Sequence, residues 1–167
     1  MAWKITEQRL GHTLIGTIDT AAQVPVGTVV RAVDDSLGGG EFIYLQGVAS
    51  TVVNDVVTYD VNFLTVRAAA GNVLPRPVAF AMQATVASTW GWYQIGGVAY
   101  ASKTKTVSMA AGIAVGVSTT AKVIHSSSLK EISGCLVAVV ASATTTTNNG
   151  ERVALMVNRP MLQGRIT

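Results

Sequence analysis

The stretch Phe42-Ile43-Tyr44-Leu45-Gln46-Gly47-Val48-Ala49, together with Trp92-Tyr93-Gln94-Ile95-Gly96-Gly97-Val98-Ala99, decides the fold. Each stretch is a run of aromatic and aliphatic residues that ends in Gly-Val-Ala, and the two lie 50 positions apart. Such runs are typical of β-strands, and large side chains at successive positions place bulky groups on both faces of a strand. We therefore expect two strands that are covered on both sides, by another layer of sheet or by a subunit.

The rest of the chain repeats this pattern in shorter form. From Val24 onward, short apolar runs alternate with Gly, Pro, Asn and Asp residues, as in strands that tight turns connect. Val, Ala and Thr make up 66 of the 167 residues, and no long segment has helical periodicity. The sequence therefore predicts an all-β fold. We expect a single compact β-barrel or jelly-roll-like sandwich over residues 24–167, preceded by an extended N-terminal arm of residues 1–23.

The apolar runs and the turn residues between them locate the individual elements. The clearest loops are Asp34–Gly40 and Thr144–Gly150, and Pro75 and Pro77 mark a turn or an edge strand, where a missing N–H does no damage. Strands are expected at Val29–Val33, Phe42–Ser50, Val56–Tyr59, Leu64–Ala68, Val78–Ala84, Gly91–Gly97, Val98–Ala101, Val107–Ala110, Ala114–Val117, Leu136–Ser142 and Arg152–Asn158.

The overall charge and hydropathy exclude several classes of partner. The net charge is +3, but 12 Lys and Arg residues spread over the chain are too dilute for a typical nucleic-acid surface, so no direct nucleic-acid contact is expected. The first ten residues include Glu7 and lack the apolar run of a secretory signal, and no apolar segment is long enough to span a membrane. We expect the chain to be made in the cytoplasm, without membrane contact, and to stay there until it assembles.

The apolar balance of the chain indicates assembly. Charged residues form only 13% of the sequence, and the mean hydropathy is +0.42. A chain of this size leaves much of its surface in contact with water. We therefore expect a partner to cover part of the apolar surface.

Side chains that could carry chemistry are few, with nine carboxylates, two His and one Cys. Cys135 lies in an apolar run and is expected to be a buried small hydrophobic residue, since no second Cys exists for an internal disulfide. His125 precedes three serines, but no Gly-x-Ser-x-Gly motif accompanies it. Asp34 and Asp35 with Glu41 could hold calcium, yet the spacing of a calcium loop is absent and turn chemistry fits better. The sequence thus predicts no enzyme, no metal and no cofactor.

One charge feature stands out, because no acidic residue occurs between Val61 and Lys130. The stretch has two interpretations: its cations are the solvated ends of loops, or they form a basic face that meets an acidic partner. The basic residues in question are Arg67, Arg76, Lys103, Lys105, Lys122 and Lys130.

The aromatic residues at the start of the predicted strand Gly91–Gly97 also allow two interpretations. Trp90, Trp92 and Tyr93 can be core or subunit contacts, or they can form a platform that stacks on sugars or bases. The first interpretation is favoured in a chain that assembles.

Three blocks of this sequence resemble the capsid decoration, or cement, proteins of tailed bacteriophages. The blocks are Leu37–Ser50, Val78–Met82 and Gly91–Ala99, and the resemblance covers roughly residues 30–101. These are packing motifs rather than catalytic ones. The resemblance implies a β-rich fold of jelly-roll or barrel type that sits as dimers or trimers on the outer shell and clamps neighbouring major capsid proteins. Residues 102–130 do not share it.

Composition and resemblance together predict a non-enzymatic structural virion protein on the outer surface of a phage capsid. Its expected partners are the major capsid protein and further copies of itself, as a homodimer or homotrimer, with residues 1–23 reaching across a neighbour. The alternative is a receptor- or glycan-binding module of the virion or tail. The residues expected at capsid or subunit interfaces are Trp3, Arg67, Arg76, Trp90, Trp92, Tyr93, Lys103 and Lys105.

Overall fold

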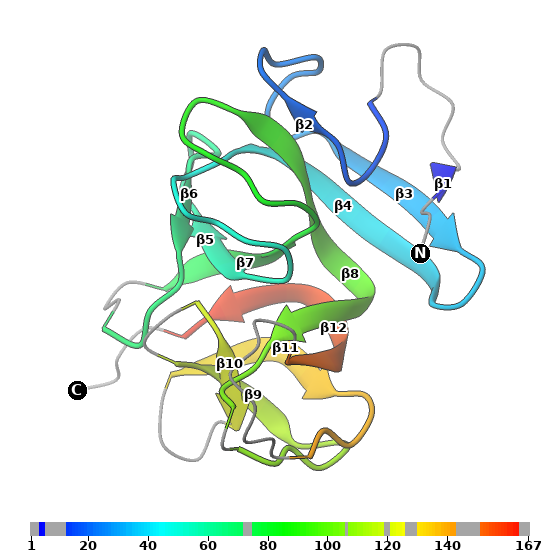
Figure 1. The fold of residues 1–167 in the computed structure, drawn as a ribbon, viewed down its shortest axis with the longest axis vertical. Helices are drawn as coiled ribbons and strands as arrows, with labels where there is room; N and C mark the ends of the chain where they lie inside the picture. The colour runs from blue at the N-terminus through cyan, green and yellow to red at the C-terminus, as the bar shows by residue number, and fades with distance from the viewer. Residues whose placement is uncertain are drawn as a thin grey trace.

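The computed structural model describes residues 4–5, 13–71, 75–105, 107–118, 121–125, 130–142 and 151–163. These residues form twelve strands and no helix, which confirms the all-β prediction (Figure 1). The strands are β1 (Lys4–Ile5), β2 (Ile18–Asp19), β3 (Val29–Asp34), β4 (Gly38–Gln46), β5 (Val56–Tyr59), β6 (Thr65–Arg67), β7 (Arg76–Ala81), β8 (Trp90–Ser102), β9 (Ala114–Val117), β10 (Val123–His125), β11 (Glu131–Val137) and β12 (Arg152–Leu162).

The strands belong to one antiparallel sheet that folds over on itself. Its order is β1-β3-β4-β8-β7-β12-β11-β9-β10, with β2 on β8, and with β5 joining β6 to β7. The order ends at β1 and β10, which do not pair, so the sheet is not a closed barrel and that expectation was wrong. The long strand β8 pairs with β4 and with β12, and the two end strands β1 and β10 lie in different halves of the molecule, where they do not meet (Figure 1).

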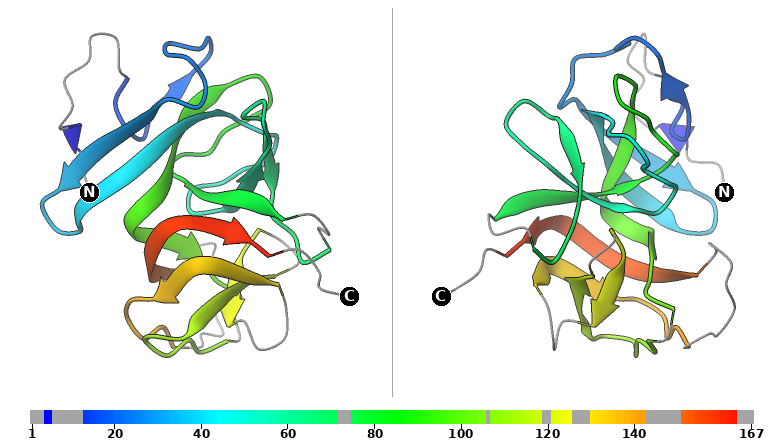
Figure 2. Two further views of the ribbon diagram at one scale, coloured as in Figure 1. Left: turned by 180° about the vertical axis from the view of Figure 1, so that it is seen from behind. Right: turned by 60° about the vertical axis from the view of Figure 1, so that its left-hand side comes forward.

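Strand β8 links the upper and lower halves of the molecule in Figure 1. Its first part pairs with β4, for example Trp92 with Tyr44, and its second part pairs with β12, for example Val98 with Met156. Both views in Figure 2 show β3 and β4 in the upper half and β9, β11 and β12 in the lower half. The chain thus uses one continuous strand where two separate strands were expected.

The decisive strands are covered on both faces, as predicted. On one face, Phe42, Tyr44 and Trp92 are fully buried and form a cluster with residues of β3. The rings of Tyr44 and Trp92 lie 5.1 Å apart with a tilt of 60°, a favourable aromatic geometry. On the other face, Leu45 and Tyr93 pack in a second cluster with residues of β5 and β7.

The first of these clusters is closed by the N-terminal segment rather than by a second sheet. Ile15, Val24 and Val26 pack against it. The Trp92 Nε1–H donates to the carbonyl oxygen of Thr13 at 3.1 Å, and the Tyr44 hydroxyl donates to the carboxylate of Asp19. The described residues 4–5 and 13–23 therefore contact their own chain, and the predicted arm over residues 1–23 is not confirmed.

The lower half contains the largest apolar cluster. Residues of β5, β7 and β8 pack there against inward side chains of β9, β11 and β12. Cys135 belongs to this cluster as an unpaired and buried thiol, and burial raises its pKa to about 12. Its predicted role as a small hydrophobic residue is confirmed.

Several predicted elements differ from the structure at their ends. Gly38, Gly39 and Gly40 belong to β4 instead of a loop, because they pair with Asp34, Val33 and Ala32. Residues 107–110 form no strand, although Met109 makes an isolated bridge to Ala141. The short strand β10 was not predicted, and β11 begins five residues before the expected Leu136. Residues 144–150 lie outside the described residues.

The bend of β8 depends on Gly97, which has a positive φ of 88°. A Cβ at this position would overlap the carbonyl oxygen of Gly39 in β4. Only glycine satisfies both the left-handed backbone and the close approach of the neighbouring strand.

We expect Gly97→Ala to lower the free energy of unfolding by about 2 kcal/mol or more, because strain and overlap add. Gly39→Ala is the matched control, since a Cβ there meets no atom within 4 Å and should change stability by less than about 1 kcal/mol. Urea unfolding followed by tryptophan fluorescence measures both. Equal effects of the two substitutions would show that the bend does not depend on Gly97.

Candidate interaction surfaces

Arg67, predicted at an interface, is held by its own chain. Its guanidinium forms an ion pair of 3.0 Å with Asp55, whose side chain is almost fully buried. Burial raises the pKa of Asp55, while the Val52 N–H and the Arg67 charge oppose that rise. Arg67 therefore stabilises a buried carboxylate in the loop before β5.

Lys103 is also an internal residue, with only 3% of its surface exposed. Its Nζ donates to a carboxylate oxygen of Glu151 at 3.2 Å and to the carbonyl oxygen of Val107 at 3.1 Å. The predicted basic face loses Arg67 and Lys103, because acids from outside the acid-free stretch pair with them. Four residues of that face remain, and all of them are half-buried: Arg76, Lys105, Lys122 and Lys130.

The aromatic residues divide between core and surface. Trp92 and Tyr93 have no exposed surface, and the Tyr93 hydroxyl bonds to the Thr85 hydroxyl at 2.7 Å. These two rings therefore form no stacking platform, and of the three aromatic residues in the glycan-binding alternative only Trp90 reaches the surface. Trp90 is half-buried against the same cluster as Trp92, and Trp3 lies outside the described residues.

The acidic residues considered for calcium serve other purposes. The carboxylate of Asp34 accepts the N–H groups of Ser36 and Leu37 at 2.9 and 3.1 Å, which confirms the turn interpretation. Asp35 pairs with Lys4, and Glu41 lies on β4, where it pairs with two arginines. Within the described part of the chain, no group of three or more His, Cys, Asp or Glu residues could hold a metal ion.

The sheet formed by β8, β12, β11 and β9 has an outward face that is unusually apolar. Met156 pairs with Val98 on one side and with Leu136 on the other, and Leu136 pairs with Ala114. One row of apolar side chains thus crosses four adjacent strands. We call this surface, with its neighbours, the outer apolar face; it comprises Val98, Tyr100, Ala114, Leu136, Val139, Val140, Ala154 and Met156.

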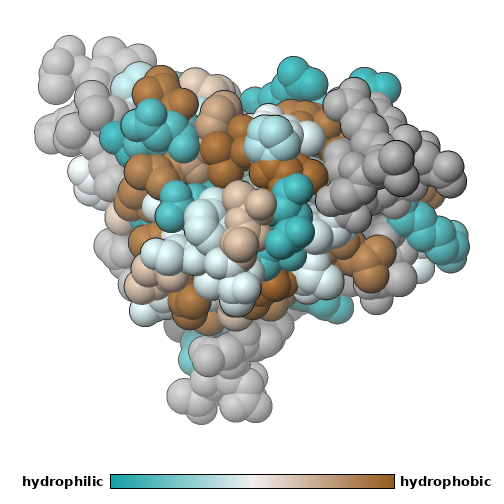
Figure 3. All heavy atoms as spheres, turned by 90° about the horizontal axis from the view of Figure 1, so that it is seen from above, coloured by the Kyte–Doolittle hydropathy of each residue, from teal (hydrophilic) through white to brown (hydrophobic). Residues whose placement is uncertain are grey.

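The apolar side chains of this face are largely exposed to solvent. Met156 is 60% exposed, Leu136 46%, and Val139 and Val140 are 63% and 64% exposed. An antiparallel sheet with one face in water normally places polar side chains outward. At the end of the molecule that carries β2, hydrophobic and hydrophilic residues do interleave (Figure 3). A contiguous exposed apolar area of this kind marks an interaction surface.

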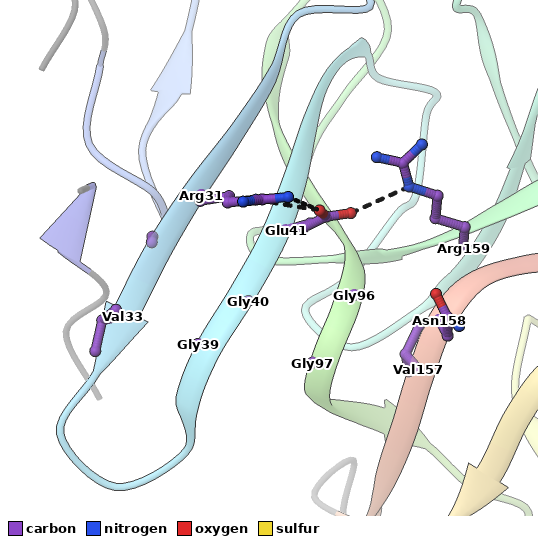
Figure 4. A pocket seen from close by; sticks show the side chains of 11 residues that line it. Arg31, Val33, Gly39, Gly40, Glu41, Gly96, Gly97, Val157, Asn158 and Arg159 are labelled. Carbon is purple, nitrogen blue, oxygen red and sulfur yellow. Dashed lines mark hydrogen bonds and ion pairs between the residues drawn. The ribbon is translucent and has the colours of Figure 1, made fainter. Parts of the chain in front are cut away.

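A second surface is a groove between the β3–β4 hairpin and β12 (Figure 4). It has a volume of about 430 Å³. Its glycine-rich floor consists of Gly39, Gly40, Gly96 and Gly97. We call it the glycine-floored groove.

Two arginines meet one carboxylate at this groove. Arg31 donates to one oxygen of Glu41 at 3.3 Å, and Arg159 donates to the other at 3.2 Å. The arginine side chains are 69% and 68% exposed. Arg159 has a positive φ of 41° at an irregularity in the pairing of β11 with β12, and such bulges redirect side chains. The sequence contains no signal that joins these residues, since Arg159 lies 118 positions after Glu41.

The structural role of Lys103 is testable. Lys103→Met should lower the free energy of unfolding by about 3 kcal/mol, because it leaves the Glu151 carboxylate buried without its partner charge. The double variant Lys103→Met with Glu151→Leu should regain most of that loss, since neither charge then remains. Urea denaturation of the single and double variants gives both values. Unchanged stability of Lys103→Met would instead agree with the interface role predicted from the sequence.

Comparison with known proteins gives no function for either surface, because no family model, no curated protein and no solved structure matches this chain. The described residues contain no helix long and apolar enough to cross a membrane. We therefore infer the function from the residues of the outer apolar face and of the glycine-floored groove.

Proposed function

We propose that this protein is a structural virion protein of a tailed phage, which binds the outside of the capsid and bridges neighbouring major capsid proteins. The observation that supports the proposal is that a small β-rich chain has two exposed candidate surfaces, the outer apolar face and the glycine-floored groove. The resemblance of residues 30–101 to decoration proteins supports the same role.

The proposal retains two finer expectations about the architecture. The packing of β5 and β7 against β9, β11 and β12 agrees with a jelly-roll-like sandwich. An N-terminal arm over residues 1–23 that contacts a neighbouring subunit stays part of the proposal, in addition to the contacts of residues 4–5 and 13–23 with their own chain.

Bridging requires contact with the shell, and we assign this contact to the side of the glycine-floored groove. Arg31 and Arg159 both form ion pairs with Glu41 at the edge of this groove. Both guanidinium groups are on largely exposed side chains. Complementary charge at such a site suits an acidic patch on a partner and fixes the register of docking. These two arginines replace Arg67 and Lys103 as the expected capsid contacts.

The proposal predicts that purified protein binds phage heads that lack it and raises their resistance to heat. The double variant Arg31→Ala with Arg159→Ala should bind at least about tenfold more weakly, and the difference should shrink as salt is added. Co-sedimentation with heads measures binding. The control is Arg76→Ala, which removes a basic residue away from the groove.

Two results would contradict this proposal. One is failure of the unmodified protein to bind such heads, and the other is equal heat resistance of heads with and without it. Loss of binding in Arg76→Ala alone would place the shell contact elsewhere on the chain.

A further inference from the structure

We propose that the outer apolar face binds a second copy of this chain, so that two sheets pack face to face around a two-fold axis. The inference rests on the proposed function for the need to bridge, and it extends that function by naming the partner of this face. Its structural basis is the arrangement of apolar and charged residues on β8, β12, β11 and β9.

The apolar row is compatible with a two-fold axis. Val98, Met156, Leu136 and Ala114 are consecutive partners across four strands. A two-fold axis that lies in the interface along this row places each of these side chains against its own copy. An isologous interface requires this property, because the same patch must complement itself.

The charges at the two ends of the face supply the complementarity. Arg152 lies four positions before Met156 on β12, with its guanidinium over the ring of Tyr100 at 4.2 Å. Glu131 lies five positions before Leu136 on β11, and it borders the same apolar hollow as Leu136 and Met156. Because β11 and β12 are antiparallel, the two charges lie on opposite sides of the row.

Arg152 lies about 13 Å from the row at the usual rise of a strand. Glu131 lies on the other side of the row, where it pairs with Gly116, two positions from Ala114 on β9, because the pairing of β11 is irregular between Glu131 and Leu136. Rotation about the row brings Arg152 of each copy to the same side of the row as Glu131 of the other. Two equivalent ion pairs would then flank a dry apolar centre.

This charge pattern favours a second copy over other occupants. Along the strands, the face has a positive charge, then the apolar row, then a negative charge. On the rotated copy this order is reversed. A uniformly acidic partner would meet Glu131 with like charge, and a uniformly basic one would meet Arg152 in the same way. The face measures roughly 30 Å by 20 Å, or about 1,200 Å² over both copies, which is at the lower end for specific interfaces.

Molar mass measured by sedimentation equilibrium tests the inference with the purified full chain. The unmodified protein should show twice the 17.4 kDa of one chain. Met156→Glu should give a monomer with an unchanged β-sheet circular dichroism spectrum. Val61→Glu is the matched control, because Val61 is 89% exposed and lies outside the outer apolar face, and it should remain a dimer.

Charge reversal tests the two-fold arrangement itself. Arg152→Glu alone and Glu131→Arg alone should each raise the dimer dissociation constant at least about tenfold. The two reversals together should restore it to within about threefold of the original value, since each pair is then complementary again. No rescue in the double variant would overturn the arrangement, as would a trimer or a monomer for the unmodified chain.

The outcomes separate this inference from the proposed function. A monomer that still binds phage heads would overturn the dimer and leave the capsid role intact. A dimer that passes the charge-reversal test but binds no heads would overturn the capsid role and leave the dimer intact.

Discussion

The bend of β8 is the constraint on which the rest of the structure depends. One strand of 13 residues pairs with β4 in its first part and with β12 in its second. The change of partner occurs at Gly96 and Gly97, where the backbone adopts a positive φ and approaches β4 closely. Because both halves of the sheet share this strand, their relative orientation follows from the backbone geometry at these two glycines.

Both interaction surfaces follow from this bend. The glycine-floored groove lies at the bend itself, where Gly96 and Gly97 leave room between β4 and β12. The outer apolar face begins just beyond it, at Val98, once β8 has turned to pair with β12. The bend therefore separates the surface that carries Arg31, Glu41 and Arg159 from the outer apolar face, and we propose different partners for the two.

Residues that are far apart in the sequence form the ion pairs of this fold. Residues 61–130 contain no acid, which suggested a basic face. In the fold, however, Asp55 neutralises Arg67 and Glu151 neutralises Lys103. A buried cation requires an opposite charge nearby, and long-range strand pairing brings that charge from outside the stretch. The exposed arginines of the groove were missed because nothing local distinguishes Arg31 or Arg159 from any other surface cation.

The sequence by itself determined the class of fold and several of its elements. The strands β5 and β9 lie where the apolar runs predict them, and the coverage of Tyr44 and Trp92 follows from large side chains at successive positions. Hydrophobic pattern and turn residues are local properties, so they can be read from the chain. Tertiary structure alone decided the continuity of β8, the open sheet, the internal pairing of Arg67 and Lys103, and the apolar row across four strands. Each of these depends on which distant strands become neighbours, and that choice is made by packing over the whole chain.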